Sequence, residues 1–233
     1  MVVHDLDRLR AEYADRERRL AGSDTYSPFN PAYLFAIQGR QRAVLGLLRR
    51  SGLNPLARHR VLEMGCGHGG VLLEYLGYGA RPERLHGADL LPARLRDACG
   101  RLPGLPLSCA DGQRLPYADG AFDLVLQYTV FSSVLDPEIK ARLAGEMLRV
   151  LRVPGGLILS YDFWLNPTNR QTRGIRPGEL RRLFPGCRFE FRRITLAPPL
   201  ARRLVRFSWL LCALLEKFWV FNTHYLVAIQ PEE

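Results

Sequence analysis

A glycine-rich segment that follows a run of apolar residues carries the clearest chemical signal in this sequence. It reads Val61-Leu62-Glu63-Met64-Gly65-Cys66-Gly67-His68-Gly69-Gly70. Glycines let a chain turn sharply and let a ligand approach the backbone closely. The helix expected behind them offers unpaired N–H groups at its N-terminus. The segment therefore predicts a small-molecule site at the end of a strand.

The glycine spacing alone leaves two classes of ligand open. Gly65, Gly67 and Gly70 satisfy the GxGxxG pattern of dinucleotide-binding folds. Asp89 follows at about the spacing of an acid that binds a ribose, so a nicotinamide or flavin oxidoreductase is one interpretation. Glu63, however, lies two residues before the first glycine. A carboxylate there would repel a pyrophosphate and would accommodate a cation.

Three more short motifs follow in chain order and narrow the choice. They are Asp111-Gly112 with Leu115-Pro116-Tyr117, then Phe122-Asp123-Leu124-Val125, then Leu151 followed by Pro154-Gly155-Gly156. Together with the glycine-rich segment and the acid at position 89, they resemble the class I S-adenosylmethionine-dependent methyltransferases. The small-molecule "type 11" branch is the most similar, and the resemblance covers roughly residues 60–162.

The resemblance implies S-adenosylmethionine as cofactor, a ligand with a sulfonium and an ammonium and without a phosphate. The positions that it assigns to cofactor binding are Glu63, Gly65, Cys66, Gly67, Asp89, Leu90, Asp111, Gly112 and Gln127. By this similarity Glu63 would help to hold the amino-acid end, Asp89 would accept hydrogen bonds from the ribose hydroxyls, and Asp111 would accept one from the adenine amine. Gln127 would line the methionine channel.

Acceptor residues are expected on the loops after the fourth and fifth strands, because ligands lie beyond the carboxyl ends of such sheets. We expect Asp162 or Tyr128 to act as general base or acceptor anchor. The candidates for the wall of an acceptor pocket are Tyr26, Phe131, Tyr161 and Trp164. A loop hydrogen bond for Asp162 and a place in the core for the aromatic residues are the alternatives.

Strand and helix patterns alternate from about residue 60 onward and predict an α/β protein. The expected strands are 60–64, 84–89, 105–110, 122–127, 157–161, 188–196 and 225–229. We expect a Rossmann-like, doubly wound seven-stranded sheet, mostly parallel with an antiparallel last strand. Helical patterns over 5–20 and 32–50 predict an N-terminal helical extension or lid at 1–55, before a methyltransferase domain at 56–233.

The chain has 233 residues and a formal net charge of +10. Lys140 and Lys217 are its two lysines, so 31 of the 33 basic residues are arginines. Residues 173–206 hold ten arginines and two acids, a local excess that favours anionic substrates, phosphates or membrane surfaces, or is simply a solvated face. Five scattered cysteines without metal-ligand spacing, and an N-terminus without a signal-peptide pattern, predict a cytoplasmic protein without a metal site.

An apolar stretch at about 200–220 predicts a single helix, which is too short in its uninterrupted apolar part to cross a bilayer. Two interpretations stay open. The helix packs on the sheet as a crossover between the last two strands, or its aromatic face contacts a lipid-like acceptor, a membrane surface or a second subunit.

We therefore expect an enzyme that transfers a methyl group to a small-molecule acceptor by in-line displacement, the acceptor being a natural product, a sugar or a lipid-like molecule. Segments such as 183–187 and 194–200 look similar to methyltransferases of natural-product or polysaccharide biosynthesis. Nucleic acid is not expected, because Gln127-Tyr128-Thr129-Val130 stands where a base methyltransferase would carry an Asn/Asp-Pro-Pro-aromatic motif. An NAD or FAD oxidoreductase and a non-catalytic S-adenosylmethionine-binding protein remain the alternatives.

Overall fold

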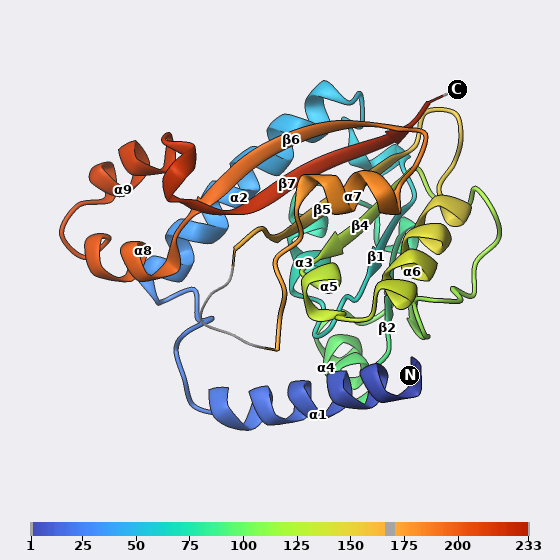
Figure 1. Cartoon of the computed structure of the whole chain (residues 1–233), viewed down its shortest axis with the longest axis horizontal. Helices are drawn as coiled ribbons and strands as arrows, with labels where there is room; N and C mark the ends of the chain where they lie inside the picture. The colour runs from blue at the N-terminus through green and yellow to red at the C-terminus, as the bar shows by residue number, and fades with distance from the viewer. Residues whose placement is uncertain (1, 166–170, 233) are drawn as a thin grey trace.

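The computed structural model describes residues 2–165 and 171–232, which fold around one seven-stranded sheet (Figure 1). The strands are β1 Val61–Met64, β2 Leu85–Asp89, β3 Leu107–Cys109, β4 Leu124–Tyr128, β5 Leu157–Phe163, β6 Cys187–Leu196 and β7 Asn222–Pro231. Their order across the sheet is β3-β2-β1-β4-β5-β7-β6. Strands β1 to β5 pair in parallel, and β7 is antiparallel to both β5 and β6. The expected sheet, with its antiparallel last strand, is confirmed.

Helices connect the strands and precede them. They are α1 Val2–Leu20, α2 Pro31–Arg50, α3 Gly70–Gly77, α4 Pro92–Arg101, α5 Val130–Ser133, α6 Pro137–Val150, α7 Pro177–Leu183, α8 Pro198–Leu204 and α9 Trp209–Glu216. Capping residues explain two of the starts: the Asn30 side chain accepts from the Ala32 N–H at 3.0 Å, and Asp136 accepts from the Glu138 N–H at 2.7 Å. Short 3₁₀ turns, η1 Leu56–Arg58, η2 Pro82–Arg84 and η3 Trp219–Phe221, complete the list.

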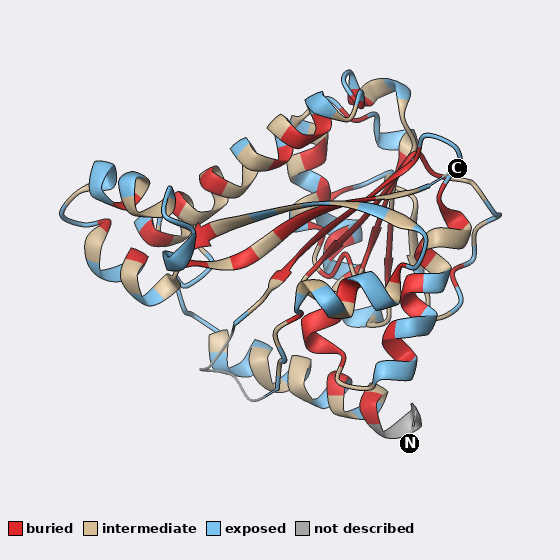
Figure 2. Ribbon diagram, turned by 45° about the horizontal axis from the view of Figure 1, so that its top comes forward, coloured by how far each residue is buried: buried red, intermediate tan, exposed pale blue. Residues whose placement is uncertain are grey.

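The buried side chains form a core on each face of the sheet, because successive strand residues point to opposite faces. Leu62 and Met64 of β1 pack with α6 and α7, whereas Val61 packs with α2 and α3. Figure 2 shows the buried strands between the two helical layers. Glu63 thereby projects toward the α2–α3 side.

Helix α1 lies across the carboxyl ends of the strands and is hydrogen-bonded to the last residue of α5 and to the segment that follows it (Figure 1). Arg8 Nη2 donates to the Ser133 carbonyl oxygen at 2.6 Å. The Asp5 carboxylate accepts from the N–H groups of Leu135 and Asp136, each at 3.1 Å. These contacts place the helix over the region where a ligand of a parallel sheet binds.

The single helix expected at about 200–220 was wrong: α8 and α9 are two short helices, followed by η3. Ser208 has an extended backbone, and its hydroxyl caps α9 by accepting from the Leu211 N–H at 3.1 Å. Apolar periodicity continues through this break, so it does not reveal the break. Among the helices of the described residues, none is long and apolar enough to span a membrane.

Candidate functional site

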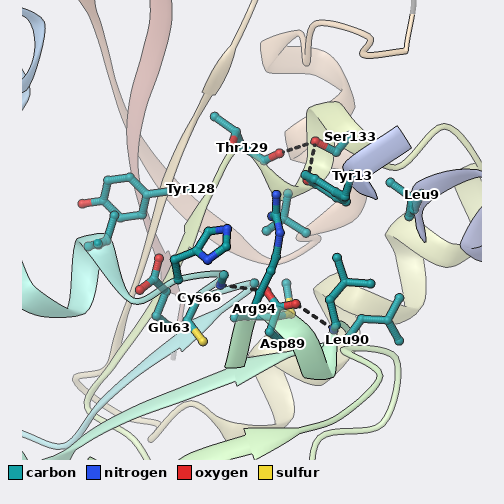
Figure 3. A pocket seen from close by; sticks show the side chains of 18 of the residues that line it. Leu9, Tyr13, Glu63, Cys66, Asp89, Leu90, Arg94, Tyr128, Thr129 and Ser133 are labelled. Carbon is teal, nitrogen blue, oxygen red and sulfur yellow. Dashed lines mark hydrogen bonds between the residues drawn. The ribbon is translucent and has the colours of Figure 1, made fainter. Parts of the chain in front are cut away.

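A cavity of about 650 Å³ opens at the carboxyl ends of β1, β2 and β4, with α1 on its far side (Figure 3). Its volume suits a small ligand. Figure 3 shows Glu63, Cys66 and Asp89 on the sheet side, and Leu9 and Tyr13 of α1 facing them. Of the nine predicted cofactor residues, those in the lining are Glu63, Gly65, Cys66, Gly67, Asp89, Leu90, Asp111 and Gly112. The three carboxylates that the sequence places near the carboxyl ends of separate strands therefore border one cavity.

The glycine turn is shaped by its backbone conformation and by its ties to β2. Gly65 has φ +77° and Gly67 has φ +53°. The N–H groups of Gly65 and Cys66 both donate to the Ala88 carbonyl oxygen, and the Gly67 N–H donates to Asp89 Oδ2 at 2.8 Å. The turn and the end of β2 thus form one rigid unit beneath the cavity.

Gly65→Ala is expected to lower stability strongly, because position 65 needs both the left-handed conformation and the missing side chain. A Cβ there would lie 2.5 Å from Val130 Cγ2. The backbone strain alone costs about 1–3 kcal/mol, and a chain of this size loses about 2–4 °C of melting temperature per kcal/mol. Gly70→Ala is the matched control, since a Cβ at Gly70 meets no atom within 4 Å. Thermal unfolding that is equal in the two variants would contradict this account.

Glu63 is the least satisfied of the three carboxylates. Its side chain is buried, and Oε2 has no hydrogen-bond partner among the described residues. Burial raises the pKa of Glu63 well above the usual value, against the opposing effect of the Arg40 guanidinium. A buried carboxylate with a free oxygen beside a cavity is suited to a cationic ligand group.

Asp89 and Asp111 are held in place by neighbouring backbone groups. Besides the Gly67 contact, Asp89 accepts from the Leu91 N–H at 2.9 Å. Asp111 Oδ1 accepts from the Gln113 N–H at 2.9 Å, and the Gln113 side-chain amide donates to both Asp111 oxygens, at 3.2 and 2.9 Å. Each carboxylate oxygen can accept more than one hydrogen bond, so both groups keep acceptor capacity for hydroxyls or an amine. The residues present fit S-adenosylmethionine.

Gln127 and Asp162 do not line the cavity, which corrects two expectations. Gln127 is fully buried; its amide nitrogen donates to Ser160 Oγ, and its oxygen accepts from the Val130 N–H at 2.9 Å. Asp162 accepts from the N–H groups of Ser132 at 3.2 Å and Phe163 at 3.1 Å. Burial raises the pKa of Asp162 to about 6. Both side chains hydrogen-bond to the backbone of the β4–α5 region. For Asp162 this is the alternative given above, a loop hydrogen bond in place of a role as general base.

Phe131 and Trp164 are also outside the lining. Phe131 is a core residue whose ring lies 5.9 Å from that of Phe184, as its alternative interpretation held. Trp164 donates from Nε1 to the Asn222 carbonyl oxygen at 2.7 Å and stacks against Arg193. Neither aromatic residue is available as an acceptor wall in this structure.

The predicted tyrosines Tyr26, Tyr128 and Tyr161 do line the cavity. The Tyr128 hydroxyl lies 3.3 Å from that of Tyr75, and burial raises its pKa above the usual value. Burial likewise raises the pKa of Tyr161 to about 12. Tyr128 therefore stays protonated at neutral pH, which makes it a poor proton acceptor.

Arg40 of α2 is a cavity residue that the sequence did not reveal. Its guanidinium lies 5.2 Å from the ring centre of Tyr128 and 5.4 Å from that of Tyr161, and it pairs with Glu74. One arginine among 31 carries no local signal, and its partner lies on another helix. The α1 side chains of the lining, such as Leu9 and Tyr13, were equally hidden, because helix docking depends on tertiary contacts.

Comparisons with known proteins agree with this arrangement. A family model described as a methyltransferase domain matches residues 62–159. An uncharacterized methyltransferase of Mycolicibacterium paratuberculosis is 32% identical over 185 residues, which cover 75% of this chain and 68% of that protein. The phthiotriol/phenolphthiotriol dimycocerosates methyltransferase 1 of Mycobacterium ulcerans is 41% identical over 117 residues, 49% of this chain and 40% of that protein. The chain thus matches less than half the length of the phthiotriol relative.

A solved structure shows the same fold over almost the whole chain. The 1,6-didemethyltoxoflavin-N1-methyltransferase of Burkholderia thailandensis, with 1,6-didemethyltoxoflavin and S-adenosylhomocysteine bound, aligns with a TM-score of 0.63 at 16% identity. The alignment covers 98% of this chain and 90% of that one. The oxidoreductase that the GxGxxG spacing left open is overturned by these relationships. Since the sequence relationship extends over two thirds of the M. paratuberculosis protein and the sheet carries the expected cofactor-sized cavity, the chain belongs to the class I S-adenosylmethionine-dependent methyltransferases.

Proposed function

We propose that this enzyme methylates a lipid-like acceptor and holds its cofactor with the carboxylates at the strand ends. Asp89 accepts from the ribose hydroxyls, Leu90 lies against the adenine, and Asp111 with the Gly112 N–H contacts its polar edge. The cofactor supplies an electrophilic methyl group on a sulfonium. The support for these roles is that the residues border one cavity and that the carboxylate oxygens of Asp89 and Asp111 can each accept a further hydrogen bond.

We assign the amino-acid end of the cofactor to Glu63 and Arg40. That end carries an ammonium and a carboxylate, so it needs one partner of each charge. Glu63 has a buried oxygen without a partner, and Arg40 has a buried Nε without one. Arg40 also pairs with Glu74 through Nη2, so its Nε is the donor left for the cofactor carboxylate. Arg16 and Arg94, two other arginines of the lining, bond to Tyr26 at 2.6 Å and Glu17 at 2.8 Å and have no such buried donor without a partner.

The first 55 residues act as a lid in this proposal. Leu6, Leu9 and Leu20 of α1 line the cavity opposite the carboxylates, so the helix both closes the site and gives it an apolar wall. Closure excludes water and strengthens the contacts that position the reacting atoms. Tyr26, half exposed in the loop between α1 and α2, stands at the cavity edge where an acceptor would enter.

The main support for a lipid-like acceptor is the apolar wall that Leu6, Leu9 and Leu20 give the cavity. Relatives of this chain are named for methyl transfer to phthiotriol and phenolphthiotriol dimycocerosates, and we take these names as support for the same acceptor class. The chain's own residues would position the acceptor for in-line attack, since correct orientation accounts for much of such a rate.

The acceptor class is tested with labelled S-adenosylmethionine and two alcohols, a detergent-dispersed long-chain 1,2-diol and glucose. We expect methylated diol by mass spectrometry, with glucose methylated at least about tenfold more slowly, a difference of about 1.4 kcal/mol in activation free energy.

Tyr26→Ala is expected to raise the KM of the diol without changing the affinity for S-adenosylhomocysteine. Phe29→Ala is the control, being highly exposed and outside the lining. Preference for glucose would overturn the acceptor class. Cofactor binding without methylation of either alcohol would favour a non-catalytic binding protein.

A further inference from the structure

An arm formed by residues 198–221, which comprises α8, α9 and η3, extends from the end of the sheet at β6 and β7 (Figure 1). Large apolar side chains on this arm are exposed to solvent. The most exposed are Phe207 at 86%, Leu210 at 70%, Trp219 at 63%, Phe218 at 60% and Val220 at 55%. Such a gathering on one element is unusual for a surface that faces only water.

The packing of the arm on the protein does not account for these side chains. Ala201, Val205 and Cys212 are buried with Phe35 of α2, and the Trp209 ring lies 5.2 Å from that of Phe35. The arm therefore has its own inward-facing apolar surface, which fixes it to α2. Trp219 also stacks with Arg193 of β6, whose guanidinium lies 4.6 Å from its ring centre. The other exposed apolar residues of the arm are not explained by this packing.

The exposed charges of the arm are all positive. Arg202, Arg203, Arg206 and Lys217 are exposed. The acid of the arm, Glu216, is turned toward α2, where its carboxylate lies 3.9 Å from Arg42 and its side chain is only 17% exposed. An anionic surface with an apolar interior complements this combination. A second copy of the same arm does not, because it would bring like charges together.

We propose that the arm docks on an anionic lipid bilayer as an interfacial anchor. Its aromatic and aliphatic side chains enter the boundary between headgroups and acyl chains, and its arginines contact lipid phosphates. Helices of seven and eight residues are far too short to span the bilayer, so the arm lies at the surface. The docking itself does not depend on the acceptor proposed above.

Docking would also bring the cavity entrance near the lipid. The arm packs on Phe35 of helix α2, and this helix begins just after the loop that contains Tyr26. In α2 itself, Tyr33 and Arg40 line the cavity. This consequence rests on the proposed lipid-like acceptor, whereas the docking is measured without any acceptor.

The test is co-sedimentation of the whole protein with phosphatidylglycerol–phosphatidylcholine vesicles and with phosphatidylcholine vesicles alone. We expect binding to the anionic vesicles that weakens with added salt, and at least about tenfold weaker binding to the neutral ones. Arg202→Gln/Arg203→Gln/Arg206→Gln should reduce the anionic partition coefficient about 100-fold, since each basic residue near the surface contributes a factor of about five. Phe207→Ser/Leu210→Ser should reduce binding to both kinds of vesicle.

Matched variants separate docking from general charge and hydrophobicity. Leu73→Ser removes a half-exposed leucine of α3, and Arg49→Gln/Arg58→Gln/Arg81→Gln removes three exposed arginines outside the arm. Both should bind vesicles nearly as the parent does, and all variants should keep the parent's affinity for S-adenosylhomocysteine. Absence of vesicle binding, or equal losses in the control variants, overturns the proposal. So does a dimer in light scattering that Phe207→Ser/Leu210→Ser dissociates while vesicles have no effect.

Discussion

Asp89→Asn is expected to weaken S-adenosylhomocysteine binding about 100-fold or more. Hydrogen bonds to a charged group contribute about 1.5–3 kcal/mol each, and about 1.4 kcal/mol corresponds to a factor of ten. The two oxygens of Asp89 already face the N–H groups of Gly67 and Leu91. An amide nitrogen in place of either oxygen would set a donor against a donor, so the glycine turn would loosen as the ribose contacts weaken.

Isothermal titration calorimetry measures this loss directly. Asp119→Asn is the matched control: the Asp119 side chain is 81% exposed and pairs with Arg149 at 2.7 Å, away from the cavity. Exposed pairs of this kind contribute about 0–1 kcal/mol, so neither affinity nor stability should change appreciably. An Asp89→Asn protein that binds within threefold of the parent would remove Asp89 from the cofactor site.

Glu63→Gln is expected to move binding and stability in opposite directions. The substitution removes a buried negative charge beside the cavity, so the affinity for the cationic end of S-adenosylhomocysteine should fall about 100-fold, in line with the loss of a charged hydrogen bond of about 3 kcal/mol. The unliganded variant should nevertheless melt at a higher temperature than the parent at neutral pH, because folding of the parent must either protonate Glu63 or bury its charge with an oxygen that lacks a partner.

The pH dependence follows from the direction of the Glu63 shift. The pKa in the folded protein lies well above the usual 4.5, so the protonated form is favoured by folding. The parent therefore has its full stability below about pH 4.5 and loses this contribution as the pH rises through the folded-state pKa. The excess melting temperature of Glu63→Gln should vanish near pH 4 and grow with pH. Affinity of the parent for the cationic ligand should also rise with pH, because Glu63 must lose its proton to pair with it.

Calorimetry and scanning fluorimetry over this pH range check both trends. Glu83→Gln, an exposed acid in the turn before β2, serves as control and should leave both curves unchanged. Lower stability of Glu63→Gln at every pH would mean that Glu63 has a structural partner, and the cation-binding role would then lose its basis.

The sequence alone was sufficient for the sheet and for the carboxylates. Alternating strand and helix patterns predict a parallel sheet, and parallel strands bring their carboxyl ends to one edge. Glu63, Asp89 and Asp111 each lie within two residues of the carboxyl end of a strand, so their approach to one cavity follows from topology. The positive φ of Gly65 can likewise be expected from the sequence, because glycine is the residue that adopts this conformation freely.

The tertiary structure decided which residues of β4 and β5 line the cavity, through the alternation of side chains along each pleated strand. Tyr128 pairs with Tyr161, and Gln127 pairs with Ser160, in the β4–β5 register. Because side chains alternate between faces, the tyrosines reach the cavity on the α2–α3 side, whereas Gln127 turns to the opposite face. Asp162, one residue beyond Tyr161, also turns away. Of each neighbouring pair here, Gln127 with Tyr128 and Tyr161 with Asp162, only the tyrosine lines the cavity, and the sequence does not say which of the two does.

Contacts between distant segments were decided by the tertiary structure alone. The place of Arg40 beside the tyrosines depends on how α2 docks on the sheet, and the apolar wall depends on how α1 crosses the strand ends. The break at Ser208, and with it the exposed face of the arm, is likewise invisible to apolar periodicity. Periodicity and motifs report local conformation, and the packing of one element against another is set by side-chain complementarity across the whole chain.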